Sequence, residues 1–350
     1  MERHCKIFAA ITSILWGAIT GCGGSVPSVV AAPTPAPTST TPTGPLPATS
    51  VFVGEEQSSG AQYAVLQFSA TANGTVAPLS TLTMPKGLQI NGIANDAAGN
   101  IYVAGQPAQN NTSEILVYAA GATGSAAPIR TIVGSATGLS YAICLTVDAT
   151  GLLYVCGNSN TISVFSPTAN GNAAPIRVIS GSTTLLNNPY RIAVDATGNI
   201  YVGNGEAGIG RILIFSAGAT GNAAPAILTG AATNLGNAFG LAFDSAGNLY
   251  VISHPVGTTS GVFGILEFAP GAIGNVAPIK TIAGNATGIF EHTGIAVDAV
   301  GNIYTVGADN VTFAPKVAVF PPTASGNVAP ATVIQSMPWD DSSLINLVIR

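Results

Sequence analysis

The chain has 350 residues and a formal net charge of −5, and only 7% of its residues are charged, against about 25% in typical globular proteins. Hydrophobic residues make up 47% of it, and it contains 42 Gly and 23 Pro. This composition excludes a disordered chain and indicates many short buried strands joined by tight turns. The 10 Lys and Arg are too few and too scattered for the basic surface that nucleic-acid binding requires, so we expect no nucleic-acid partner.

The first residues are typical of an export signal. Arg3 and Lys6 precede an apolar run over residues 7–19, which is too short to span a membrane. The small residues Thr20 and Gly21 then lead to Cys22. This junction resembles the bacterial lipobox, which implies that residues 1–21 are a lipoprotein signal peptide and that Cys22 becomes a diacylated N-terminus. The alternative is an ordinary secretory signal with a cysteine there by chance.

The segment after Cys22 consists mainly of Gly, Ser, Pro, Thr and Ala, as in the run APTPAPTSTTPTGPLPATS. It cannot bury a core, so residues 22–50, which begin at the acylated cysteine, are predicted to form a semi-extended tether. In Gram-negative lipoproteins, which this junction resembles, a residue other than Asp after the cysteine favours the outer membrane, and Gly23 stands here. We therefore expect an exported protein that is lipid-anchored in the bacterial envelope, at the outer membrane or the cell surface.

From residue 51 onward the sequence repeats with a period of roughly fifty residues. Each unit contains a strand that ends in aspartate, the element GNIYV, and a strand that ends in an aromatic residue. The GNIYV strands, one of them degenerate, begin at Asn100, Leu152, Asn199, Asn248 and Asn302. The aspartates are Asp96, Asp148, Asp195, Asp244 and Asp298. The aromatic residues are Phe68, Tyr118, Phe165, Phe215, Phe268 and Phe320.

Each unit predicts four short antiparallel strands, represented by the sequences IAVD, NIYV, ILVF and PIRTI. The Asp-x-x-Gly-Asn link between the first two is a tight hairpin signal, because aspartate caps its own turn and glycine accepts a positive φ. Four antiparallel strands that repeat in this way form the blades of a β-propeller.

The two ends of the repeat region predict how the propeller closes. Residues 50–54 match the second strand of a unit, and residues 344–349 match the first. Together they supply one blade beside five intact units. We therefore predict an all-β fold, a six-bladed propeller over residues 51–350 whose N- and C-terminal strands share one blade. A linear solenoid would instead need polar caps at its ends.

The pattern GIAVDxxGNIYV, followed by a strand ending in Val-Phe, resembles the NHL repeat across nearly all of residues 51–350. The usual NHL unit continues with an acidic-Asn-Arg-Ile run, of which only Gly210-Arg211-Ile212 is left here. NHL propellers include peptide binders, RNA binders and lyases, so the resemblance implies a propeller and no single activity.

The sequence contains no convincing catalytic constellation, and it predicts neither a cofactor nor a metal site. The repeat aspartates are interpreted as turn caps, because catalysis cannot require the same residue in five blades. His254 and His292 fall in loops of different blades, outside any metal-binding spacing. The innermost strands read as apolar or small apart from Asn95, Asn346 and the terminal aspartates, which argues against a metal enzyme centred on the axis.

Two cysteines flank the turn between Asp148 and Leu152. If these two residues face each other, the same antiparallel register places Cys144 opposite Cys156. In an oxidising compartment the pair can form a structural disulfide, and two buried thiols are the alternative.

Loops that vary between units are the expected place for a binding site, because binding residues concentrate on loops held by a rigid scaffold. The turns between first and second strands, and between third and fourth, are near-copies and should form one uniform face. The other connections should emerge on the opposite face. The binding candidates there are Tyr141, Tyr190, Arg191, Arg211, His254, Glu291, His292, Trp339, Asp340 and Asp341. The cluster Trp339-Asp340-Asp341 is the most distinctive, because aromatic residues suit contacts with a partner.

These features favour a non-enzymatic binding or scaffold module that engages a protein, a peptide or a glycan through its variable face. Two alternatives stay open. A propeller enzyme of lyase or lactonase type would need His254, His292 and nearby acids to converge. A structural or cell-adhesive surface repeat protein would have a smooth loop face.

Overall fold

The computed structural model describes residues 50–56, 62–107, 112–157, 159–204, 210–253, 263–308, 315–335 and 344–350. By its contacts the chain divides into the units Met1–Thr40 and Thr41–Arg350, and all described residues belong to the second. The predicted signal peptide, Cys22 and almost all of the predicted tether therefore lie outside the described residues. The described part of the chain contains no helix with the length and hydropathy of a membrane span.

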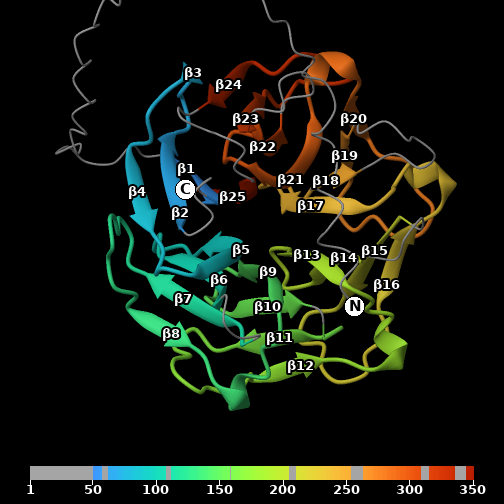
Figure 1. Ribbon diagram of the computed structural model, residues 1–350. Helices are drawn as coiled ribbons and strands as arrows, with labels where there is room; N and C mark the ends of the chain where they lie inside the picture. The colour runs from blue at the N-terminus through green and yellow to red at the C-terminus, as the bar shows by residue number, and fades with distance from the viewer. Residues whose placement is uncertain are drawn as a thin grey trace, which may run out of the picture. The chain divides into compact units, whose positions relative to one another are not determined.

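The second unit consists of six β-sheets around a central axis, each built on four antiparallel strands (Figure 1). We number these sheets as blades 1 to 6 in chain order and give their strands from the axis outward. Blade 1 has β25 (Leu344–Ile349), β1 (Ser50–Glu56), β2 (Tyr63–Ser69) and β4 (Ser80–Thr83); blade 2 has β5 (Leu88–Asn95), β6 (Ile101–Pro107), β7 (Glu114–Tyr118) and β8 (Arg130–Ile132); blade 3 has β9 (Ala142–Val147), β10 (Leu153–Gly157), β11 (Ile162–Phe165) and β12 (Arg177–Ile179). Blade 4 has β13 (Pro189–Val194), β14 (Ile200–Asn204), β15 (Arg211–Phe215) and β16 (Ala226–Thr229); blade 5 has β17 (Ala238–Phe243), β18 (Leu249–Ser253), β19 (Gly264–Phe268) and β20 (Lys280–Ala283); blade 6 has β21 (Phe290–Val297), β22 (Ile303–Ala308), β23 (Pro315–Phe320) and β24 (Thr332–Gln335).

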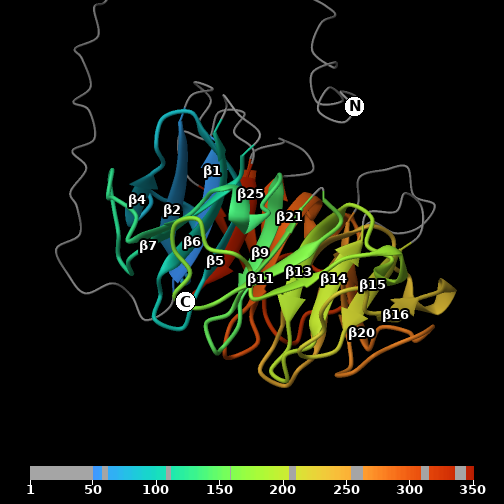
Figure 2. The ribbon, with the colours of Figure 1, turned by 90° about the horizontal axis from the view of Figure 1, so that it is seen from below.

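The ring closes within blade 1, as the two ends of the repeat region predicted. Strand β1 pairs antiparallel with β25, and Val53 faces Leu347. Ser50 and Arg350 exchange two backbone hydrogen bonds, at 2.7 and 2.9 Å. Blue β1 and red β25 lie side by side in both ribbon views (Figures 1 and 2). The prediction of a six-bladed β-propeller with a shared terminal blade is confirmed.

The hydrophobic core is divided into six clusters, each between two successive blades. Between blades 4 and 5, for example, Tyr201 and Ile212 lie in one cluster with Leu249 and Phe268. The aromatic residues that end the third strands of all six blades are buried, with at most 1% of their surface exposed. Burial of such a side chain contributes about 1.5–3 kcal/mol, so these repeated aromatics stabilise the contacts between blades.

The connection between the third and fourth strands of each blade extends to the outer strand of the preceding blade. In blade 4, Gly221 pairs with Ile179 of blade 3 and donates its N–H to the carbonyl of Val178 at 2.7 Å. The equivalent bridges join Leu82 to Gly124, Ile132 to Gly171, Leu228 to Gly274 and Ile282 to Gly326. In blade 1 the same segment forms the short strand β3 (Gly74–Thr75), which pairs in parallel with β24 of blade 6. We call these six contacts the rim clasps.

An asparagine in four of the rim clasps caps a short 3-10 helix of the preceding blade. These helices are η2 (Ser135–Thr137), η3 (Ser182–Thr184), η4 (Ala231–Thr233) and η5 (Asn285–Thr287). For η3, Asn222 Oδ1 accepts the N–H of Thr183 at 2.8 Å. A Cβ at Gly181, whose φ is 121°, would lie 2.5 Å from the same oxygen, so this position requires glycine.

Candidate functional sites

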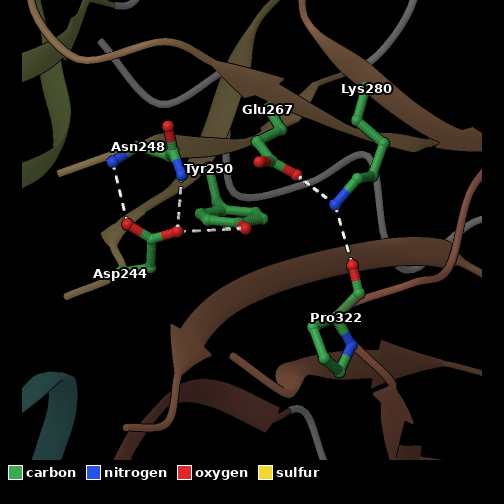
Figure 3. A network of polar contacts seen from close by, with 6 residues as sticks. All are labelled: Asp244, Asn248, Tyr250, Glu267, Lys280 and Pro322. Atoms are coloured by element: carbon green, nitrogen blue, oxygen red, sulfur yellow. Dashed lines mark hydrogen bonds and ion pairs between the residues drawn. The ribbon is translucent and has the colours of Figure 1, made fainter. Parts of the chain in front are cut away.

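One face of the propeller carries the Asp-x-x-Gly turns that join first and second strands, and we call it the turn face. In blade 5, the Asp244 carboxylate accepts hydrogen bonds from the backbone N–H and the side chain of Asn248, at 2.9 and 2.8 Å (Figure 3). It also accepts the backbone N–H of Ala246 at 2.9 Å. The Tyr250 hydroxyl donates to the same carboxylate at 3.3 Å. Asp96, Asp148, Asp195 and Asp298 also accept bonds from their own turns. The repeat aspartates therefore serve as turn caps.

A second polar group of the turn face links neighbouring blades. Lys280 forms an ion pair with Glu267 at 2.7 Å and donates to the carbonyl of Pro322 in blade 6 at 2.8 Å (Figure 3). Burial, followed by the charges of Glu267 and Asp244, raises the pKa of the Tyr250 hydroxyl, which stays protonated as a hydrogen-bond donor. Arg130 of blade 2 and Arg177 of blade 3 likewise bond to carbonyls of the following blade. These three basic side chains near the turn face thus stabilise the contacts between neighbouring blades.

The second-to-third strand connections leave from the opposite face, which we call the loop face. It is marked by the ends of the second strands at Glu56, Pro107, Gly157, Asn204, Ser253 and Ala308. Tyr141, just before β9, belongs to this face, and it combines two unusual properties. Its φ is 49°, which is a rare and strained conformation for an aromatic residue, and 37% of its surface is exposed.

Several residues predicted to lie in variable loops instead lie in strands. Tyr190 and Arg191 belong to β13, the inner strand of blade 4, and Arg211 is the first residue of β15. Glu291 and His292 lie within β21, although their side chains are outside the described residues. The expectation was wrong for Tyr190, Arg191, Glu291 and His292 because bulges let β13 begin at Pro189 and β21 begin at Phe290.

The remaining candidates belong to two segments outside the described residues. His254 lies in the segment 254–262, and Trp339, Asp340 and Asp341 lie in the segment 336–343, both outside the described residues. Within the described ranges, no three His, Cys, Asp or Glu side chains come close enough to hold a metal ion.

Cys144 and Cys156 face each other across β9 and β10, in the register that the Asp148 turn predicted. Their Cα atoms are 5.1 Å apart, and their sulfurs are joined in a disulfide. Both side chains are buried, at 3% and 2% exposed, in the cluster between blades 3 and 4. The disulfide is therefore buried in the core, where its role is structural.

The axis of the propeller holds a pocket of about 240 Å³, lined by the inner strands of all six blades. Along β9, exposure increases toward the turn face: Leu145 is 5% exposed, whereas Thr146 and Val147 are partly exposed. Arg191 and Cys144 lie at the opposite, deep end of the pocket lining, two or three residues further from the turn face. The pocket is therefore a well that opens toward the turn face.

Arg191 contributes a positive charge to this well. Its Nε donates to the carbonyls of Phe239 in blade 5 and Thr293 in blade 6, at 2.7 and 3.0 Å, and its Nη1 donates to the carbonyl of Tyr190 at 2.8 Å. Arg191 is partly buried, and desolvation lowers the pKa of its guanidinium to about 10, so it stays charged at neutral pH. The prediction that the inner strands offer no charge beyond their terminal aspartates is wrong at this residue.

No family model matches the chain, and no curated protein matches it. Its structure is similar to that of a protein of unknown function from Bacteroides caccae, with a TM-score of 0.57 and 13% identity over 86% of this chain and 98% of the other. It is also similar to a protein from Lactobacillus plantarum, with a TM-score of 0.52 and 15% identity over 82% of each chain. At this level of identity the likeness concerns the fold alone. By its sheet topology and these likenesses, the chain is a six-bladed β-propeller.

Proposed function

We propose that the protein is an exported, lipid-anchored binding module of the bacterial envelope, built on an NHL-like repeat, that holds a protein, peptide or glycan on its loop face. The acylated Cys22 and the tether over residues 22–50 keep the propeller at a membrane and let it stand away from the lipid surface. The sequence supports the anchor, and the contrast between the two faces supports the binding site.

The contrast between the faces is the observation that carries the proposal. On the turn face, the repeated polar groups are bonded to their own turns or to the next blade, as Asp244 and Lys280 are. On the loop face, the connections differ in length from blade to blade, and Tyr141 is held exposed at a cost of about 1–3 kcal/mol of backbone strain. The equivalent residue of blade 4, Asn188, has a φ of 47°, so the repeat sets this conformation, but an asparagine tolerates it far better than an aromatic residue does. A tyrosine kept at this strained position is typical of a functional site.

The position of Tyr141 is fixed by its neighbours. A Cβ on Gly157 would collide with the carbonyl oxygen of Tyr141, so β10 can approach this residue only because it ends in glycine. The exposed ring is thus presented on a rigid support, which is the usual design of a contact residue that binds at little entropic cost.

Site-specific photocrosslinking tests the binding face. In cells that produce the full chain, a photoreactive benzoyl-phenylalanine replaces Tyr141, and in a matched control it replaces Val300, which is 73% exposed in a turn of the turn face. We expect a discrete crosslinked species from position 141 and none from position 300. Equal crosslinking from both positions, or none from position 141, would show that the loop face around Tyr141 is not the binding surface.

Metabolic labelling tests the anchor separately. We expect radiolabelled palmitate to be incorporated into the full chain and to be lost in Cys22→Ala, whereas Cys5→Ala should retain it. Label that persists in Cys22→Ala would contradict the lipoprotein assignment without affecting the crosslinking result.

A further inference from the structure

The axial well has the composition of a small-anion site that is separate from the loop face. Among the described residues that line it, Arg191 is the only Lys or Arg, and no described acid forms an ion pair with its guanidinium. Arg191 is partly buried, and a partly desolvated charge that has no counter-charge among the described residues is costly. The three carbonyls that Arg191 contacts offset only part of that cost. An anion in the well would supply the counter-charge.

The guanidinium keeps donors available for such an anion. An arginine carries five N–H donors, and the hydrogen bonds that Arg191 makes with described residues involve only Nε and Nη1. Among the described residues, Nη2 has no hydrogen-bond partner. Bidentate pairing of a guanidinium edge with a carboxylate is among the stronger polar contacts in proteins.

The walls of the well suit a polar ligand. Each inner strand has a ladder partner on one side only, so its other backbone edge, with N–H and C=O groups, faces the axis. Thr146 lines the well, and its hydroxyl has no hydrogen-bond partner among the described residues. It lies two strand positions nearer the turn face than Cys144, which is level with Arg191, so the two levels are roughly 7 Å apart. A small molecule with a carboxylate and a hydroxyl spans such a distance.

The size of the well limits the ligand further. A volume of about 240 Å³ is below the range of roughly 300–1,000 Å³ typical of pockets for drug-sized ligands. The repeat aspartates near the mouth do not compete for Arg191, because each is bonded within its own turn, as Asp195 is to Thr197 and Asn199.

We infer that the axial well binds a small hydroxycarboxylate, whose carboxylate pairs with the free edge of Arg191 and whose hydroxyl faces Thr146 and the inner strand edges. This site is independent of the partner surface proposed above, since ligand entry is from the turn face. The loop-face crosslinking experiment can therefore fail while this inference holds, and the reverse is also true.

The test uses the purified full chain and lactate as the probe. We expect lactate to shift the side-chain ¹⁵Nε resonance of Arg191 in a saturable way, and lactamide, its uncharged analogue, to bind at least about tenfold more weakly. Arg191→Gln should lose lactate binding by calorimetry, whereas Lys86→Gln, which removes an exposed cation, should retain it. The inference would be overturned if lactate and lactamide bound equally well, or if Arg191→Gln bound lactate with undiminished affinity. It would also be overturned if chloride displaced lactate at the concentrations at which lactate itself binds.

A second variant keeps the test decisive if Arg191→Gln does not fold. Ala242→Leu adds bulk to a partly exposed position of the well and leaves Arg191 in place. We expect this variant to keep a cooperative thermal transition and to bind lactate at least about tenfold more weakly. Full lactate affinity in a folded Ala242→Leu protein would show that the ligand does not occupy the well.

Discussion

Arg191 in blade 4 donates its Nε hydrogen to the backbone carbonyl of Thr293 in blade 6, 102 positions further along the chain, at 3.0 Å. Blade 5 stands between these two blades in the ring, and the same Nε also reaches its Phe239 carbonyl. One side chain thus joins three successive blades at the axis. At the rim, the same blades are joined by the clasps and by Lys280.

The terminal blade should be essential for stability. Leu347 of β25 is 2% exposed and packs in the cluster between blades 6 and 1 with Val51 and Val53. We expect Leu347→Ala to lower the free energy of unfolding by about 2–5 kcal/mol, because it leaves a cavity at the ring closure. Denaturant titration measures this change. The control Val300→Ala, at a position 73% exposed, should change stability by less than about 0.5 kcal/mol. Similar values for both variants would contradict a closure that depends on β25.

The asparagine of a rim clasp should act as a helix cap between blades. Asn222→Ala removes the oxygen that accepts the Thr183 N–H, and we expect a loss of about 0.5–2 kcal/mol in the free energy of unfolding. Thr183→Ala keeps the N–H donor and removes only an exposed side chain, so it should be close to neutral. If both variants unfold at the same denaturant concentration as the parent protein, the cap does not stabilise the clasp.

The disulfide should stabilise blade 3 without affecting the other blades directly. It closes a loop with a sequence separation of 12, for which chain entropy predicts roughly 3 kcal/mol of stabilisation. We expect dithiothreitol to lower the thermal midpoint of the parent protein and to leave that of the Cys144→Ala, Cys156→Ala double variant unchanged. A parent protein that melts identically with and without reductant would show that the bond makes no contribution.

Alkaline titration should reveal the buried tyrosine of blade 6. Burial, followed by the charge of Asp298, raises the pKa of Tyr304 to about 12, against 10.0 for a free tyrosine. Because the folded pKa is the higher one, its contribution to stability is complete below pH 10 and is lost as the pH rises from 10 to 12.

The comparison variant is Tyr304→Phe, which removes the hydrogen bond from the hydroxyl to Asp298, 3.2 Å long. At pH 8 we expect it to be less stable than the parent protein by about 1 kcal/mol, and the difference should narrow above pH 10. Urea titrations of the two proteins at pH 8 and at a pH above 10 measure this difference in the free energy of unfolding. A constant difference up to pH 12 would contradict the raised pKa.

The strand order and the cysteine pairing could be predicted because both depend on contacts within one unit. The Asp148 turn fixes the register of β9 and β10, and that register alone brings Cys144 opposite Cys156. The same local logic identified the aromatic ends of the third strands as a repeated structural element, and Phe215 and Phe268 are fully buried.

Contacts between units were harder to predict from the sequence. Nothing in the motif Gly221-Asn222 indicates that its side chain reaches a helix of the preceding blade, since a repeat pattern does not show which copy a residue contacts. Arg191 was named as a binding candidate, but its place at the axis was missed for a related reason. It precedes an apolar run and was interpreted as a loop residue, whereas the ladder continues past it and directs it to the axis. The corresponding positions in blades 2 and 5 are the glycines Gly92 and Gly240. An arginine where other repeats have glycine was therefore the sequence signal that could have identified Arg191.

The mutual hydrogen bonds of Ser50 and Arg350 place the two ends of the repeat region side by side within one blade. A short linker between these residues would turn the repeat region into a continuous circle, and the break could then be moved to the connection between β18 and β19 or to that of another blade. Blade 1, assembled from both ends of the chain, would become an ordinary contiguous unit. The order of the blades in the gene is therefore one of several circular permutations that the same ring can accommodate.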